Sequence, residues 1–234
     1  MKKNTMMRIA SFLLIAVLLS TSAISGTYAK YVSADEGGDF ARVAEWGVVV
    51  EAKNFNMFTD KYETEDATFT GQYSVDGEGE DVLAPGTKGK FAEIRIIGTP
   101  EVAVEVAIEP TVEITGNWVI NGDFYCPVVI TVGETAICGL KYDNADAFAK
   151  AIADELKNKS EKYNPNTDLS TIYDNTNLDL AWEWAFEDAD HVALNCDCAA
   201  GAQTDKLDTA LGDRAVADEL KISIGVKISV TQID

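Results

Sequence analysis

Apolar and polar residues alternate with a period of two along much of this chain, and that period is typical of β-strands. The clearest case is the C-terminal stretch 220–232, LKISIGVKISVTQ, in which an apolar residue stands at every second position from Leu220 to Val230. Stretch 101–114, EVAVEVAIEPTVEI, alternates valine and isoleucine with alanine and glutamate over its first half. Strands with one apolar and one polar face belong to antiparallel sheets that are wet on one side.

Three shorter stretches show the same alternation and predict three more strands. Their inward positions are Trp46, Val48 and Val50 in AEWGVVVEA, Phe69, Tyr73 and Val75 in FTGQYSV, and Leu178, Leu180, Trp182, Trp184 and Phe186 in LDLAWEWAFE. Exposed, Trp182 and Trp184 would make a sugar-stacking platform. Because both are in phase with the leucines of their stretch, the pattern favours a place in the core.

One stretch has the period of a helix instead. In DNADAFAKAIADELKNK, Phe148, Ile152 and Leu156 follow one another at intervals of four, and Asp143 or Asn144 can cap the start. We therefore predict a helix over about 144–158, followed by a long loop over 160–177. A shorter helical turn is expected in TDKLDTALG, ended by Gly212.

The stretch CPVVITVGETAICGL predicts a hairpin that turns near Gly133–Glu134. Folding it there brings Cys126 and Cys138 to roughly opposite positions, so a cross-strand disulfide between them is expected if the register allows it. The alternative is two free buried thiols. The acidic, glycine-rich stretch 76–89 lacks the spacing of an EF-hand and is expected to be a solvated loop with a tight turn at Pro85–Gly86.

Strands dominate this pattern, and one helix is inserted between them. The sequence therefore predicts a mainly β fold, an antiparallel two-sheet sandwich of jelly-roll or immunoglobulin-like type. With no repeat and no linker, one domain is expected over 46–234, preceded by a separate N-terminal segment, 30–45.

The first 29 residues have the three parts of a signal peptide. A short basic end is followed by an apolar run, FLLIAVLL, and then by small residues. The apolar part is shorter than the roughly 20 residues that span a bilayer. Thr27 and Ala29 stand at positions −3 and −1 of a cut between Ala29 and Lys30. We expect export with no stable membrane anchor after cleavage; the alternative is an uncleaved N-terminal anchor.

The charge of the chain excludes two classes of partner. Formal net charge is −20, and removal of the leader, with three basic residues and no acidic one, takes it to −23. Such a charge repels nucleic acid and anionic lipid headgroups. It keeps a secreted protein soluble, and it must be screened when copies assemble.

Little in the sequence indicates catalysis. With His191 as the only histidine, motifs that need two, such as HExxH, are ruled out. The stretch HVALNCDC gathers His191, Cys196 and Cys198, which could bind zinc or copper, but C-x-C alone is a weak signal and disulfide pairing is favoured. No nucleophile, base and orienting group assemble. We expect no enzyme activity, no cofactor and no metal.

Against this background, the stretch SGTYAKYVSADEGGDFARVAEWGVVVEA resembles the start of the TasA–camelysin family of bacterial surface proteins. The resemblance is carried by the tetrapeptide Gly26-Thr27-Tyr28-Ala29 at the end of the leader and by the aromatic start Lys30-Tyr31-Val32. It continues through the entry into a first strand from Phe40 to Val50. The turn Ala84-Pro85-Gly86, the helical insertion and the last strand ending at Thr231-Gln232 also match.

This resemblance implies an exported jelly-roll domain, cut by a signal peptidase. It also implies a fibre protein of the biofilm matrix, outside a bacterial cell or on its surface, in which the freed N-terminal segment of one subunit adds as a strand to the next. Candidate donor residues are Tyr31, Val32, Phe40 and Val43. Partners would be further copies of the chain and other matrix proteins. The alternatives are a monomeric adhesin or carbohydrate-binding module, and a camelysin-like secreted metallopeptidase, for which the sequence lacks ligands.

Overall fold

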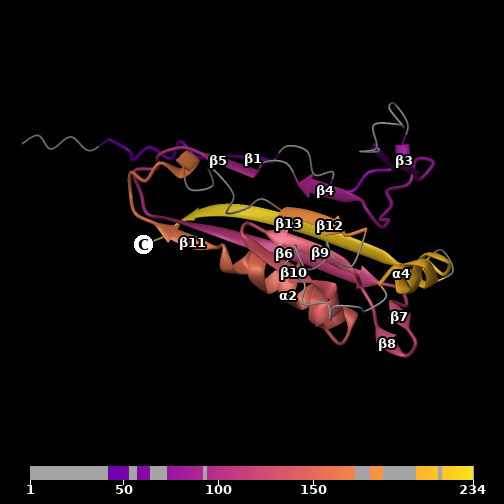
Figure 1. Cartoon of the computed structure of the whole chain (residues 1–234). Helices are drawn as coiled ribbons and strands as arrows, with labels where there is room; N and C mark the ends of the chain where they lie inside the picture. Colours follow the sequence, from indigo (N-terminus) through magenta and orange to yellow (C-terminus); the bar gives the residue numbers. More distant parts are fainter. Residues whose placement is uncertain are drawn as a thin grey trace, which may run out of the picture. The chain divides into compact units, whose positions relative to one another are not determined.

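The computed structural model describes residues 42–52, 57–63, 73–91, 94–171, 180–186, 204–215 and 218–233 (Figure 1). The chain divides into two units, residues 1–43 and residues 44–234. The strands and helices of the described residues all belong to the second unit.

The second unit is mainly β, and the strand pairs in its described parts are antiparallel. A four-stranded sheet has the order β10–β9–β12–β4, and a three-stranded sheet has the order β11–β6–β13. Their bounds are Thr135–Cys138, Val128–Val132, Leu180–Trp184 and Lys88–Phe91 for the first, and Glu161–Tyr163, Val104–Thr115 and Lys221–Gln232 for the second.

Three short ribbons complete the strands. They pair β1 (Val49–Ala52) with β5 (Ile94–Ile97), β2 (Lys61–Glu63) with β3 (Tyr73–Asp76), and β7 (Val119–Ile120) with β8 (Asp123–Phe124). The helices are α2 (Ala145–Asn158) and α4 (Thr204–Gly212), and single 3₁₀ turns are η2 (Gly139–Lys141) and η3 (Leu169–Thr171).

One apolar core joins both larger sheets and α2. It contains Ile108 and Ile222 from β6 and β13, Ile130 and Trp182 from β9 and β12, and Phe148 from α2. A second, smaller cluster packs Ile96 of β5 against Val104 and Val106 of β6 and Leu169 of η3. The predicted mainly β, antiparallel class is confirmed.

The predicted helix is confirmed. The side chain of Asn144 caps α2 by accepting a hydrogen bond from the Ala147 N–H at 2.8 Å. Phe148, Ile152 and Leu156 form its buried face, and the helix packs against β6 and also contacts β9 and β10. The predicted loop over 160–177 is wrong in part, because it contains β11 and η3. Residues 172–177 lie outside the described parts.

The buried side of β12 also follows the prediction, but only as far as Trp184. Leu180, Trp182 and Trp184 are buried, so the two tryptophans lie in the core. Phe186 was expected on the same face and is 66% exposed. The ladder ends at Trp184, whose N–H donates to the Thr87 carbonyl and whose carbonyl accepts from the Gly86 N–H. Beyond it, Phe186 lies over the turn at Gly86.

The predicted strand over 44–52 is shorter than expected. Strand β1 begins at Val49, and Trp46 and Val50 are exposed rather than buried. Gly47 explains the late start of β1, because its backbone has a φ of +52°, which interrupts an extended strand. The inward face of this stretch is therefore limited to the half-buried Val48.

The expected Cys126–Cys138 disulfide is wrong. The hairpin does turn at Gly133–Glu134, but this pairing places Cys138 opposite Val129, three residues away from Cys126. An offset of an odd number of residues puts the two side chains on opposite faces of the sheet. Cys126 packs in the main core as a free, buried thiol, whereas Cys138 packs with Val129 and is disulfide-bonded. The remaining cysteines, Cys196 and Cys198, lie outside the described residues.

Strands β6 and β13 pair along their full length. One contact shows which of their residues hydrogen-bond to each other. Just beyond β13, the Ile233 N–H donates to the carbonyl of the directly opposite Ala103 at 3.0 Å. Because bonded and non-bonded pairs alternate in an antiparallel ladder, odd-numbered residues of both strands bond to each other. The backbone groups of even-numbered residues point away from this pairing, toward the side of β11 in β6 and toward the outer edge of the sheet in β13.

Pro110 in β6 fits this parity. Pro110 is the cross-strand partner of Val226, and as an even-numbered residue its backbone nitrogen points away from β13. The N–H that proline lacks would therefore not have bonded to β13, so no ladder bond between β6 and β13 is lost. On the same side of β6, the Ile108 N–H donates to Ser160 Oγ at 2.9 Å.

Candidate assembly surface

Of the four predicted donor residues, the structure describes one. Val43 is 93% exposed, directly before the boundary between the two units. Tyr31, Val32 and Phe40 lie outside the described residues, as do both sides of the predicted cut, Ala29 and Lys30.

The chain enters the second unit beside the segment that follows β5. The Glu45 N–H donates to the Glu101 carboxylate, and the Glu101 N–H donates to the Glu45 carbonyl, each at 3.0 Å. Nearby, a Cβ placed on Gly98 would meet the Gly47 carbonyl oxygen at 2.3 Å, so the two backbones approach too closely for a side chain. Residues 45–52 are thus held along 94–101.

The ribbon of β1 and β5 has one apolar face that is left open. Val49 and Ile97 are direct cross-strand partners, and they are 53% and 41% exposed. The neighbouring pair, Val50 and Ile96, points to the other face, where Ile96 is buried in the smaller core. With the exposed Trp46, these side chains put apolar surface on the first residues of the second unit.

Strand β13 is the longest strand whose outer side has no ladder partner in the parts of the chain that the structure describes. Its twelve residues pair with β6 on one side only, and β1 contacts it without forming a ladder. The free edges of the four-stranded sheet belong to β4 and β10, which have four residues each. An unpaired edge offers N–H and C=O groups to another strand.

One buried polar network holds α4 to the sheet. The Tyr125 hydroxyl donates to one oxygen of the Asp208 carboxylate at 2.6 Å, and Trp184 Nε1–H donates to the other at 3.1 Å. Asp208 is 4% exposed. This contact could not be predicted from the sequence, because the three residues are far apart in the chain. A lone aspartate at a helix-core position was the one hint.

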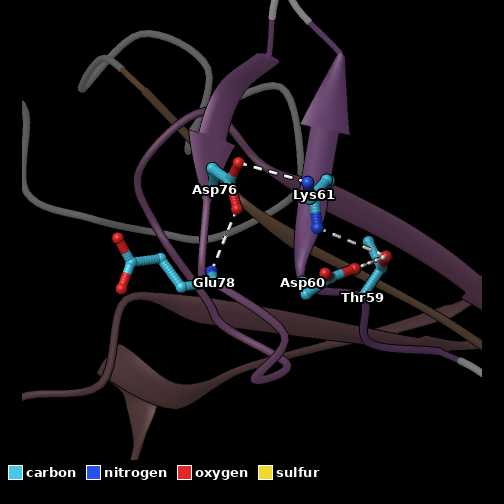
Figure 2. Close-up of polar contacts among 5 residues, drawn as sticks. All are labelled: Thr59, Asp60, Lys61, Asp76 and Glu78. Atoms are coloured by element: carbon cyan, nitrogen blue, oxygen red, sulfur yellow. Dashed lines mark hydrogen bonds and ion pairs between the residues drawn. The ribbon is translucent and has the colours of Figure 1, made fainter.

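A second polar group, at the β2–β3 ribbon, is exposed (Figure 2). Lys61 Nζ lies 3.3 Å from the Asp76 carboxylate, and the Glu78 N–H donates to Asp76 Oδ1 at 2.9 Å. The Glu78 N–H, followed by Lys61, lowers the pKa of Asp76. Thr59 Oγ1 bonds to Asp60 in the preceding turn. Each of these contacts closes a turn or pairs a strand.

The described residues contain no group of three or more histidine, cysteine, aspartate or glutamate side chains placed to hold a metal ion. The candidate ligands His191, Cys196 and Cys198 lie outside them. Burial raises the pKa of the Cys126 thiol to about 12, so this thiol is protonated and unreactive at neutral pH.

Within the described parts, none of the helices combines the length and the apolar character that crossing a membrane requires.

Comparison with known proteins adds no relative: no family model, no curated protein and no solved structure matches the chain.

Proposed function

We propose that this chain is an exported structural protein of the TasA–camelysin type, whose copies assemble into extracellular or cell-surface fibres of a biofilm matrix. The observation that carries the proposal is the exposed apolar surface where the chain enters the domain. Trp46, Val49 and Ile97 are exposed there, and none of them belongs to the apolar clusters of the described residues. Apolar surface of this kind marks a site that another chain covers.

The mechanism proposed is strand donation. After a cut between Ala29 and Lys30 by signal peptidase, the segment with Tyr31, Val32 and Phe40 is free to add to the sheet edge of another subunit. Strand addition supplies backbone hydrogen bonds, and alternate side chains supply specificity. A contact of this head-to-tail kind does not close on itself, so repeated addition makes a filament. A jelly-roll arrangement of the two sheets is part of the proposal.

The magnitudes are compatible with assembly. Full burial of one large apolar side chain contributes about 1.5–3 kcal/mol. Association costs roughly 4–15 kcal/mol in lost translational and rotational freedom. Three or four buried apolar side chains, together with a ladder of hydrogen bonds, offset a cost of that size.

The test compares two forms of the protein by negative-stain microscopy and sedimentation. Protein that starts at Lys30 should form filaments, and protein that starts at Val43 should stay monomeric. Circular dichroism of both forms is the control, because the domain core lies after residue 43 and both should show the same strand content. Equal polymerisation of the two forms would refute strand donation.

A further inference from the structure

The outer edge of β13 is oriented to receive another strand. Because the odd-numbered residues of β13 bond to β6, its even-numbered residues direct their N–H and C=O groups away from β6. These residues are Ile222, Ile224, Val226, Ile228, Val230 and Gln232. Their side chains meanwhile point to the core face, where Ile222, Ile224, Val226 and Ile228 pack in or against the main cluster. The edge is therefore rigidly held by its side chains while its backbone groups face outward.

The charge of β13 is opposite to that of the chain as a whole. It carries Lys221 and Lys227 and no acidic residue, in a chain of net charge −20. The N-terminal segment 30–41, KYVSADEGGDFA, carries three acidic residues and one lysine. Lys227 is paired with Glu109 of β6 at 2.8 Å, but β13 itself carries no acidic residue, so charge is compatible with an acidic segment as an occupant of its edge.

Length also fits. The segment between the predicted cut and the first described residue has twelve residues, and β13 has twelve. Extended, each spans about 40 Å at roughly 3.3 Å per residue.

We infer that the outer edge of β13 is the acceptor for residues 30–41 of a second copy of this chain, an inference that rests on the proposed function. Opposite charges align the segment with the strand, and the outward N–H and C=O groups of the even-numbered residues form the new ladder. Ile228 and Val230 pack against the smaller core, whereas the half of the edge from Ile222 to Val226 does not. A substitution that blocks strand addition is therefore best placed between Ile222 and Val226.

Val226→Pro tests the acceptor edge in the protein that starts at Lys30. Proline has a similar size to valine and removes only an outward N–H, so the β6–β13 ladder is kept; Pro110 already occupies the directly opposite position. The loss of an edge donor and the steric block by the ring should raise the critical concentration for filament growth at least about tenfold. Val226→Ala is the matched control, because it removes more side chain but keeps the N–H, and it should polymerise like the parent.

Amide hydrogen exchange of the unmodified protein gives a second readout that needs no variant. The amides of Ile222, Ile224 and Val226 should exchange quickly in dilute monomer and slowly in filaments, whereas those of Ser223, Gly225 and Lys227 should be slow in both. If the even-numbered amides are already slow in dilute monomer, the chain's own segment covers the edge and the second-copy assignment is wrong.

The outcomes separate this inference from the proposed function. If the Val43 start abolishes filaments but Val226→Pro polymerises normally, or if the even-numbered amides stay fast in filaments, strand donation stands and β13 is not its acceptor. If Val226→Pro fails to fold, the exchange pattern alone decides. If the Lys30 start makes no filaments, the proposed function itself fails.

Discussion

At the scale of single residues, Asp208 has the most demanding environment, because a carboxylate lies in an apolar core with donors on both oxygens. Replacing it with alanine removes this acceptor from the Trp184 indole N–H and from the Tyr125 hydroxyl, which keeps the Thr204 carbonyl at 3.4 Å. Loss of a short hydrogen bond to a buried carboxylate is costly. We expect Asp208→Ala to lower the free energy of unfolding by about 2–4 kcal/mol in urea titrations.

Asp205 provides the matched control on the same helix. It is exposed, so Asp205→Ala should change stability by less than about 0.5 kcal/mol. Tyr125→Phe should fall between the two, because it removes one donor and leaves the carboxylate with Trp184. Equal effects of Asp208→Ala and Asp205→Ala would show that the buried network contributes nothing.

The burial of Cys126 should make the free energy of unfolding depend on pH in the alkaline range. Burial holds the pKa of its thiol at about 12 in the folded protein, above the value of 9.0 expected for an exposed thiol. Between these values the folded state keeps a proton that the unfolded state has lost. The thiol therefore costs no stability below pH 9, and above it the free energy of unfolding should fall by up to about 1.4 kcal/mol per pH unit.

Urea titrations at pH 7, 9 and 10 check this. Cys126→Ala should start less stable at pH 7 but should lose less stability than the parent between pH 9 and 10. Tyr62, whose pKa burial also raises, is present in both proteins and cancels in the comparison. Parallel pH profiles would contradict the prediction.

At the scale of elements, the cap of α2 can be tested separately from its packing. Asn144→Ala removes the acceptor of the Ala147 N–H and should cost about 1 kcal/mol. Asn144→Asp or Asn144→Ser should restore most of the loss, since either side chain caps equally well. A thermal unfolding series of the three variants measures this, and equal values for alanine and serine would exclude a capping role.

Elements with a strong local period were predictable from the sequence. The face of α2 and the alternation of β12 and β13 follow from periods of 3.6 and 2, which each stretch shows without its neighbours. The start of β1 could not be predicted, because the run of valines does not indicate that Gly47 has a positive φ. The cysteine pairing failed on register: a turn at Gly133–Glu134 already places Cys126 three positions out of line with Cys138.

The candidate site was only partly predictable for a related reason. The N-terminal segment could be singled out by its place after the predicted leader and by its apolar residues. The proposed acceptor edge could not be predicted, because the pairing with β6, more than a hundred residues away, decides which backbone groups of β13 face outward. The Tyr125–Asp208–Trp184 network likewise depends on long-range contacts.

At the scale of the whole molecule, net charge should oppose the proposed assembly. Copies cut after Ala29 would each carry a charge near −23 and repel one another, and added salt shortens the range of this repulsion from about 10 Å at 0.1 M to about 3 Å at 1 M. Filament growth of protein that starts at Lys30 should therefore be faster in 0.5 M than in 0.05 M sodium chloride, as measured by light scattering. Growth that slows with salt would mean that attraction between β13 and the segment outweighs the overall repulsion.

Export makes a prediction of its own. N-terminal sequencing of the protein from culture medium should find a start at or within a few residues of Lys30. Recovery of protein that starts at Met1 would contradict export by cleavage. A Thr27→Lys variant, which puts a large charged residue at position −3, should accumulate uncut, whereas Thr27→Ala should be processed normally.

Pro110 has a consequence for the form of a fibre. β6 is the central strand, and beyond its pairing with β11 the proline removes one backbone donor from this side, whereas β13 keeps its donors on the other side of the sheet. A strand that docked on β6 would lack that hydrogen bond, so the two sides of the three-stranded sheet are unequal as acceptors. If β13 receives the donated strand, growth through β13 alone gives unbranched filaments, and Pro110→Val, which restores the missing donor, should make the two sides more alike.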